Sequence, residues 1–160
     1  MRADEEDPNG PEAGTRFLAE NRKKKDVIAC SSGLQYRVIK EGDGLVRPGL
    51  DTKCACHYIG ALLDGTQFDS SYEKGRPSTF RPDQVIKGWT EAMTLMATAG
   101  VRETADPAVA GDKYELFVPY NLAYGAKGMP DRGIPPKATL IFTMELVKVI
   151  DDRGGCCVVA

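Results

Sequence analysis

The 160-residue sequence is poor in the residues on which metal centres and histidine-based catalysis depend. Its single histidine, His57, excludes a site with several histidine ligands and leaves a histidine-centred catalytic site dependent on one position. Lys and Arg number 21 against 23 Asp and Glu, and the net charge of −2 argues against a dedicated nucleic-acid-binding protein. No apolar run approaches the ~20 residues that a membrane-spanning helix needs.

The cysteines and the chain ends bear on location. Five cysteines, an odd number, indicate a reducing compartment. Residues 1–11 are acidic and lack the basic-then-apolar order of a secretion signal, so we expect a cytoplasmic protein. The last four residues, which begin at Cys157, match the C-a-a-X prenylation pattern, and Cys156 could carry a second lipid. Membrane attachment through this lipid and a plain disordered tail both stay open for residues 151–160.

Cys54, Cys56 and His57 form a short cluster of metal-ligand types. In a strand, Cys54 and Cys56 point to one face and His57 to the other. No second Cys or His cluster exists to complete four ligands. The sequence therefore predicts small buried thiols, with neither a metal nor a cofactor.

The rest of the chain divides by composition. Residues 1–13 are rich in Asp, Glu, Pro and Gly and predict a disordered acidic tail. Residues 14–32 predict a helical arm, with a helix from Thr15 to about Asp26. Residues 33–150 predict one domain. Its predicted strands cover 33–40, 52–63, 112–118 and 138–150, and a further strand starts at 66–68. Its predicted helix carries an apolar face of Val85, Ile86, Trp89, Met93 and Met96. This pattern predicts an α+β fold, an antiparallel sheet with one helix laid across it.

Five aromatic residues fall on segments that this fold brings together: Tyr58, Phe68, Trp89, Tyr124 and Phe142. A hydrophobic core and an apolar ligand pocket with the only tryptophan at its base are both consistent with them. A long loop rich in Gly and Pro, residues 119–136, lies between two predicted strands, and loops of this length are usually functional.

Six short motifs occur in the order typical of FKBP-type peptidyl-prolyl cis-trans isomerases, and residues 33–150 resemble this family. They are HYIG at 57–60, FDSS at 68–71, VIKGW at 85–89, LAYG at 122–125, IPP at 134–136 and ATLIF at 138–142. The segments FLAEN at 17–21 and SGLQY at 32–36 further resemble the macrophage infectivity potentiator (Mip-like) branch.

The resemblance implies a twisted antiparallel sheet wrapped over one short helix, with an N-terminal helix, and an enzyme that accelerates X–Pro bond rotation in peptides and folding proteins. Such rotation must break amide resonance, a barrier of ~18–20 kcal/mol, and needs no proton or nucleophile. The enzyme needs only to bind the twisted amide better than the planar one. A binding module or chaperone with incidental isomerase activity is the alternative.

The resemblance also implies the site. The implied catalytic residues are Tyr58, Asp69, Ile86 and Tyr124, and the implied substrate-binding residues are Phe68, Val85, Trp89, Ile134 and Phe142. The implied ligands are proline-containing peptides, client proteins and macrolides of the tacrolimus and rapamycin type.

Several positions depart from the family pattern. Lys74 stands where an arginine often pairs with the pocket aspartate, and Met129 replaces a residue that is often polar. Ser78 stands where an aromatic residue often lines the pocket, so we expect one wall to be open. About ten residues within 97–111 are extra, either as a surface insertion or as a partner site. Residues 1–32 are short for the dimerisation segment of Mip-like proteins, so we expect a monomer.

Overall fold

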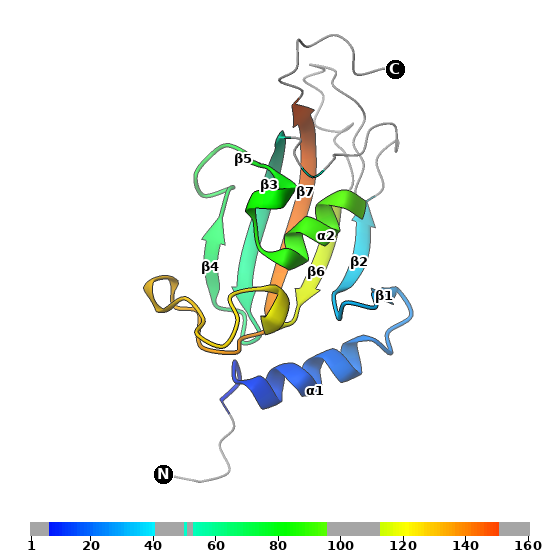
Figure 1. Cartoon of the computed structure of the whole chain (residues 1–160), viewed down its shortest axis with the longest axis vertical. Helices are drawn as coiled ribbons and strands as arrows, with labels where there is room; N and C mark the ends of the chain where they lie inside the picture. The colour runs from blue at the N-terminus through cyan, green and yellow to red at the C-terminus, as the bar shows by residue number, and fades with distance from the viewer. Residues whose placement is uncertain (1–6, 41–49, 51–52, 96–112, 151–160) are drawn as a thin grey trace.

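An antiparallel sheet with a short helix across one face positions the site in this computed structural model, which describes residues 7–40, 50, 53–95 and 113–150 (Figure 1). The helices are α1 (Pro11–Asn21) and α2 (Lys87–Leu95), with 3-10 turns η1 (Pro82–Gln84), η3 (Tyr120–Leu122) and η4 (Pro130–Arg132). The strands are β1 (Val27–Ala29), β2 (Gln35–Lys40), β3 (Lys53–Leu62), β4 (Gln67–Ser70), β5 (Ser78–Phe80), β6 (Lys113–Val118) and β7 (Leu140–Ile150). The segments 97–111 and 151–160 lie outside the described residues.

The strand order is β1-β2-β6-β7-β3-β4, with β5 also paired to β3, and every pairing is antiparallel. The long central pair β3 and β7 runs from Lys53 opposite Ile150 to Leu62 opposite Leu140. The α+β prediction is thus confirmed, as are the four main predicted strands. The three-residue strands β1 and β5 are too short to show an alternation, and the sequence does not predict them.

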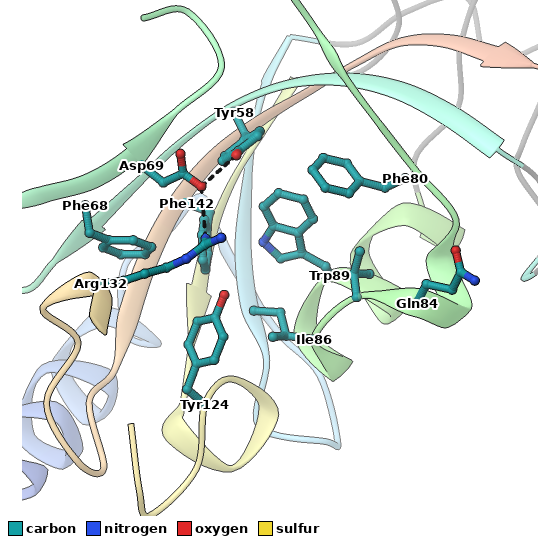
Figure 2. Close-up of a pocket in the computed structure, with 11 residues that line it drawn as sticks. Tyr58, Phe68, Asp69, Phe80, Gln84, Ile86, Trp89, Tyr124, Arg132 and Phe142 are labelled. Atoms are coloured by element: carbon teal, nitrogen blue, oxygen red, sulfur yellow. Dashed lines mark hydrogen bonds and ion pairs between the residues drawn. The ribbon is translucent and has the colours of Figure 1, made fainter. Parts of the chain in front are cut away.

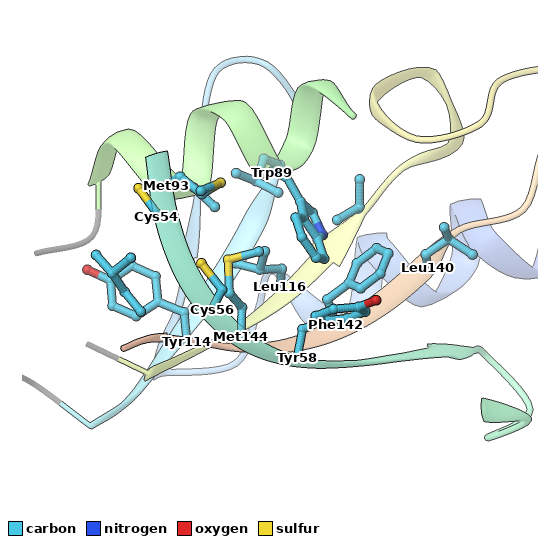
Figure 3. Packing of buried hydrophobic residues seen from close by; sticks show 14 of the residues in the cluster. Cys54, Cys56, Tyr58, Trp89, Met93, Tyr114, Leu116, Leu140, Phe142 and Met144 are labelled. Carbon is cyan, nitrogen blue, oxygen red and sulfur yellow. The ribbon is translucent and has the colours of Figure 1, made fainter. Parts of the chain in front are cut away.

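The alternation of β3 decides which side chains face α2. Cys54, Cys56, Tyr58 and Leu62 are buried, whereas His57 lies on the opposite face, as the period of two predicts. Burial raises the pKa of Cys54 to about 11 and that of Cys56 further. Figure 3 shows these side chains packed with others from α2, β6 and β7, namely Trp89, Met93, Tyr114, Leu116, Leu140, Phe142 and Met144.

Helix α2 begins two residues later than the apolar stripe predicts. Val85 has an extended backbone, and the Ile86 carbonyl accepts the first helical hydrogen bonds, from the N–H groups of Trp89 and Thr90. Periodicity cannot separate an apolar residue just before a helix from one in its first turn, which is why the prediction starts at Val85. The consequence is that Val85 and Ile86 lie on an extended stretch beside the site.

Helix α1 begins at Pro11 and ends at Asn21, whereas the sequence predicts a helix from Thr15 to about Asp26. Proline suits the first helical turn, because its missing N–H is not needed there and its φ is already helical. Neither α1 nor any other helix in the described ranges is long and apolar enough to cross a membrane.

The predicted acidic tail, residues 1–13, also ends earlier than expected. Residues 11–13 form the first turn of α1, and Asn9 is held by the hairpin that follows β3. The Asn9 amide donates to the Asp64 carboxylate at 3.0 Å, and its oxygen accepts from the Asp64 backbone N–H at 3.1 Å. These contacts fix the segment just before the helix, while residues 1–6 lie outside the described residues.

Helix α1 crosses one end of the sheet, next to the loop between β6 and β7 (Figure 1). The ring of Phe17 packs against Phe117 at 5.8 Å between centroids. The buried Asn21 amide donates to Gln35 Oε1 at 2.9 Å, and Gln35 Nε2 donates to the Leu18 carbonyl at 3.0 Å. A paired polar contact inside an apolar interface fixes the helix in one orientation, because a shift would leave buried polar groups unpaired.

We predict that Gly14→Ala lowers the free energy of unfolding, although alanine favours a helix by about 1 kcal/mol over glycine. A Cβ on Gly14 would overlap the Thr139 hydroxyl oxygen and lie 3.2 Å from Thr139 Cβ. Overpacking of this kind typically costs about 1–3 kcal/mol. Denaturant titration should show a net loss that becomes smaller in a Thr139→Ala background. A gain in stability from Gly14→Ala alone would contradict this docking of α1.

Candidate functional site

A cavity of about 430 Å³ opens where α2, β4 and the loop between β6 and β7 meet (Figure 2). Eight of the nine residues that the resemblance implies line it: Tyr58, Phe68, Asp69, Val85, Ile86, Trp89, Tyr124 and Phe142. Phe80, Gln84 and Arg132 line it as well. The ninth implied residue, Ile134, is 1% exposed and belongs to the hydrophobic core instead of the cavity wall.

Trp89 lies at the centre of the aromatic part of the cavity. Its indole meets the rings of Tyr58, Phe80 and Phe142 edge to face, with centroids 5.1, 5.1 and 5.2 Å apart. Aromatic rings prefer such tilted contacts, because the positive edge of one ring meets the negative face of another. The indole Nε1 is buried and has no hydrogen-bond partner among the described residues. Tyr58, Trp89 and Phe142 therefore belong both to the hydrophobic core and to the cavity wall.

Phe80 lines the cavity near Ser78, where we expected an open wall, and Ser78 is not among the lining residues. This ring stands at 89° to Trp89 and at 66° to Tyr58. Ser78 and Phe80 are two positions apart in β5, opposite Cys56 and Cys54 of β3. The aromatic side chain that β5 contributes to the cavity is thus Phe80, from the other end of a strand too short to predict.

Asp69 joins the cavity wall to two cations. It accepts a hydrogen bond from the Tyr58 hydroxyl at 2.7 Å. Lys74 Nζ lies 3.4 Å from its Oδ1 and also donates to the Tyr58 hydroxyl at 3.3 Å. Arg132 Nη1 lies 3.2 Å from its Oδ2, a contact drawn in Figure 2. Lys74 thus pairs with the aspartate from the position where the family often has an arginine, whereas Arg132 is a partner that no motif indicates.

These contacts set the protonation states of Asp69 and Tyr58. Burial raises the pKa of Asp69, but the Tyr58 hydrogen bond and the charge of Lys74 together outweigh it, so the pKa lies below its ordinary value. The pKa of Tyr58 is raised, mainly by burial and then by its bond to Asp69. At neutral pH the site therefore holds an ionised carboxylate and a neutral phenol.

The polar atoms that face the cavity are few. Figure 2 shows the Tyr124 hydroxyl directed into it. Ile86 lies on the extended stretch before α2, and no described residue accepts a hydrogen bond from its backbone N–H. An apolar site with a few convergent polar groups is the usual form of a ligand-binding pocket.

His57 takes no part in this cavity. Its Nδ1 lies 2.8 Å from the Ser71 hydroxyl oxygen, and its ring stacks on Tyr72 with centroids 4.4 Å apart. The Ser71 oxygen also accepts from the Tyr58 backbone N–H at 2.7 Å. His57 therefore helps to hold Ser71, whose hydroxyl oxygen in turn binds the backbone of Tyr58. Among the described residues, no three His, Cys, Asp or Glu side chains gather as a metal site would require.

The comparison with known families decides the identity of the fold. Residues 46–147 match the family described as FKBP-type peptidyl-prolyl cis-trans isomerase. The chain belongs to this family. Residues 2–38 also match the domain found amino-terminal to FKBP-type peptidyl-prolyl isomerases, which accounts for α1. The FKBP-type fold implied by the motifs is thus confirmed.

Similar proteins agree with this assignment. The chain is 44% identical over 142 residues to the macrophage infectivity potentiator of Trypanosoma cruzi, covering 89% of this chain and 66% of that protein. The crystal structure of FkpA from Escherichia coli superposes with a TM-score of 0.74 at 38% identity, over 87% of this chain and 59% of that one. The resemblance of the chain to the Mip-like branch is thus confirmed. The chain spans two thirds or less of the length of these relatives.

One comparison corrects the expected location. A protein of Legionella longbeachae named "Outer membrane protein MIP" is 41% identical over 136 residues, covering 85% of this chain and 52% of that protein. The expectation of a cytoplasmic protein, with a prenyl group as its route to a membrane, is therefore wrong. It relied on the odd number of cysteines, on the composition of residues 1–11 and on the last four residues, and none of these features decides a compartment. Cys156 and Cys157 lie outside the described residues.

We predict that Asp69 stabilises the folded chain above its unfolded-state pKa of about 4, and that this contribution is lost as the pH falls through the lower folded-state pKa. The stability difference between wild type and Asp69→Asn should therefore shrink between neutral pH and about pH 3. Thermal or urea unfolding across this range measures it. Tyr58→Phe removes the hydrogen bond at 2.7 Å and should flatten the dependence. A difference that grows on acidification would contradict the sign.

Proposed function

We propose that this FKBP-family chain accelerates cis–trans rotation of X–Pro bonds in peptides and folding proteins. The observation that carries the proposal is the cavity in which three aromatic rings pack edge to face with Trp89 while the polar groups stand at the rim. Such a cavity can hold a proline ring in an apolar environment. The X–Pro amide bond next to that ring can then rotate out of contact with water.

The proposed mechanism uses binding alone. A twisted amide loses its resonance, so its nitrogen becomes pyramidal and its carbonyl less polar than in the planar form. An apolar cavity favours that less polar form, and the preference lowers the barrier without any proton transfer. Nothing in this mechanism requires a histidine, in keeping with the place of His57 outside the cavity.

Each wall residue has a proposed role. Ile86 N–H and the Tyr124 hydroxyl hold the peptide carbonyls on either side of the proline and so fix its ends while the bond rotates. Asp69 and Tyr58 keep the polar edge of the cavity in one hydrogen-bonded arrangement. Phe68, Val85 and Phe142 enclose the ring. We assign Ile134 an indirect role, since its burial anchors the loop that carries Arg132.

We predict that Trp89→Leu lowers kcat/KM on a Leu-Pro tetrapeptide by more than about tenfold, equivalent to 1.4 kcal/mol. The reason is that leucine removes the ring that three aromatic edges contact. NMR exchange or a protease-coupled assay measures the rate against the unaided reaction, which takes tens of seconds or longer. Ile28→Ala, at an exposed position of β1, is the matched control and should leave the rate unchanged.

Wild-type protein without a rate above that of Trp89→Leu would overturn the isomerase proposal and leave a binding module in its place. Circular dichroism of both variants checks that a lost rate is not lost folding. The binding-module alternative drew on the open wall expected at Ser78 and on the extra residues within 97–111, and the wild-type rate separates it from the isomerase.

We further predict that tacrolimus and rapamycin compete with the peptide. A volume of about 430 Å³ falls in the range of small-molecule pockets, and aromatic walls with few polar groups suit such ligands. Trp89 is the only tryptophan in the chain, so ligand entry should change its fluorescence directly. Tyr124→Phe should weaken binding through the lost hydroxyl. An unchanged spectrum at micromolar macrolide would contradict the prediction.

A further inference from the structure

Arg132 is the one cation that reaches the cavity from the loop between β6 and β7 within the described ranges. It lines the cavity, and Figure 2 shows it between Phe68 and Tyr124 at the mouth. Its side chain is 52% exposed, so it stands at the boundary between solvent and the site. A charged side chain in this position can meet a substrate before and after the substrate is seated.

The charge at the mouth does not balance. Asp69 faces two cations, with Lys74 3.4 Å from one carboxylate oxygen and Arg132 3.2 Å from the other. The hydrogen bonds and cations around the carboxylate keep the pKa of Asp69 below its ordinary value, so it stays ionised. These two cations and one anion sum to one positive charge at the entrance to a pocket whose other lining residues are uncharged.

The loop that carries Arg132 holds its shape without the arginine. Met129 and Ile134 form an isolated bridge, with N–H···O distances of 2.9 and 3.0 Å in the two directions. Gly133 has φ +76°, a left-handed conformation that glycine adopts freely and that closes the turn. Burial of Ile134 anchors the far end of the loop. The guanidinium takes no part in these contacts, so at the mouth it can act in binding.

A guanidinium has five N–H donors, and the ion pair with Asp69 uses Nη1. The other donors can bind a second carboxylate, for which the planar guanidinium is well suited. A residue next to the bound proline lies within one side-chain length of the mouth, because the proline ring occupies the cavity beneath it. The peptide group most able to use the surplus charge is thus an acidic side chain beside the proline.

We propose that Arg132 is a specificity-determining residue, which directs this site toward X–Pro peptides in which X is Glu or Asp. The inference rests on the proposed isomerase function and adds to it a substrate class. Lys74 contributes to the same field, but it bonds to the Tyr58 hydroxyl and so serves the wall of the cavity as well. Removal of the Arg132 charge changes the electrostatic field at the mouth and leaves the Lys74–Tyr58 hydrogen bond of the cavity wall in place.

The test compares two isosteric tetrapeptides, with Glu-Pro and Gln-Pro bonds, together with a Leu-Pro peptide. In wild type, kcat/KM for Glu-Pro should exceed that for Gln-Pro by about twofold to fivefold, as expected of a partly exposed ion pair. The gain should lie in KM and should fall as salt is added, because salt screens exposed charges. In Arg132→Gln the two peptides should become equal. The control Lys127→Gln removes the same charge from an exposed position of the same loop and should keep the preference.

A purely structural role for Arg132 would slow all three peptides equally and leave the Glu-to-Gln ratio unchanged, which would overturn the proposal. Failure of the isomerase function is distinguished by the wild-type rate on Leu-Pro, a peptide that offers Arg132 no carboxylate to bind. If that rate is absent, titration of Trp89 fluorescence with the Glu-Pro and Gln-Pro peptides still tests the role of Arg132 in binding. Equal affinities of wild type for the two would overturn the role of Arg132, whereas tighter Glu-Pro binding that is lost in Arg132→Gln would support it.

Discussion

The edge-to-face packing around Trp89 is the contact on which the rest of the site depends. Rings from β3, β5 and β7 reach the indole, so the helix, the sheet edge and the central strand meet at one side chain. Gly60 allows this approach, because a Cβ there would lie 2.7–2.9 Å from the rings of Phe68 and Phe142. The aromatic walls formed by Tyr58, Trp89 and Phe142 are therefore part of the packed core.

The polar groups of the site have a different origin. Asp69 and Tyr58 lie on paired strands, and Lys74 comes from the turn that follows β4. Arg132 comes from a loop about sixty residues later. The apolar interior is thus set by the sheet and α2, while the electrostatic character of the mouth is set by turns. A fold organised in this way can keep one reaction while its preference for substrates changes.

Much of the fold follows from local patterns. The period-two alternation places Cys54, Cys56 and Tyr58 on the buried face, and the motifs place eight of nine implied residues on one cavity. Phe80 could not be predicted because a strand of three residues is too short to show an alternation of side chains. Arg132 was beyond reach because its role comes from a contact 63 residues distant, and a lone cation in a loop carries no pattern. Ile134 was misplaced because a motif aligns residues without showing which of them are covered.

The bridge between Met129 and Ile134 closes a segment of four residues at the mouth of the pocket, and Arg132 ties this segment to Asp69. Hydrogen bonds close the segment at its base, and the buried Ile134 anchors it. Substitution of Arg132 can therefore change the charge at the mouth while the bridge, the left-handed Gly133 and Ile134 keep the path of the backbone. The shape of this entrance and its charge are thus carried by different residues of one short segment.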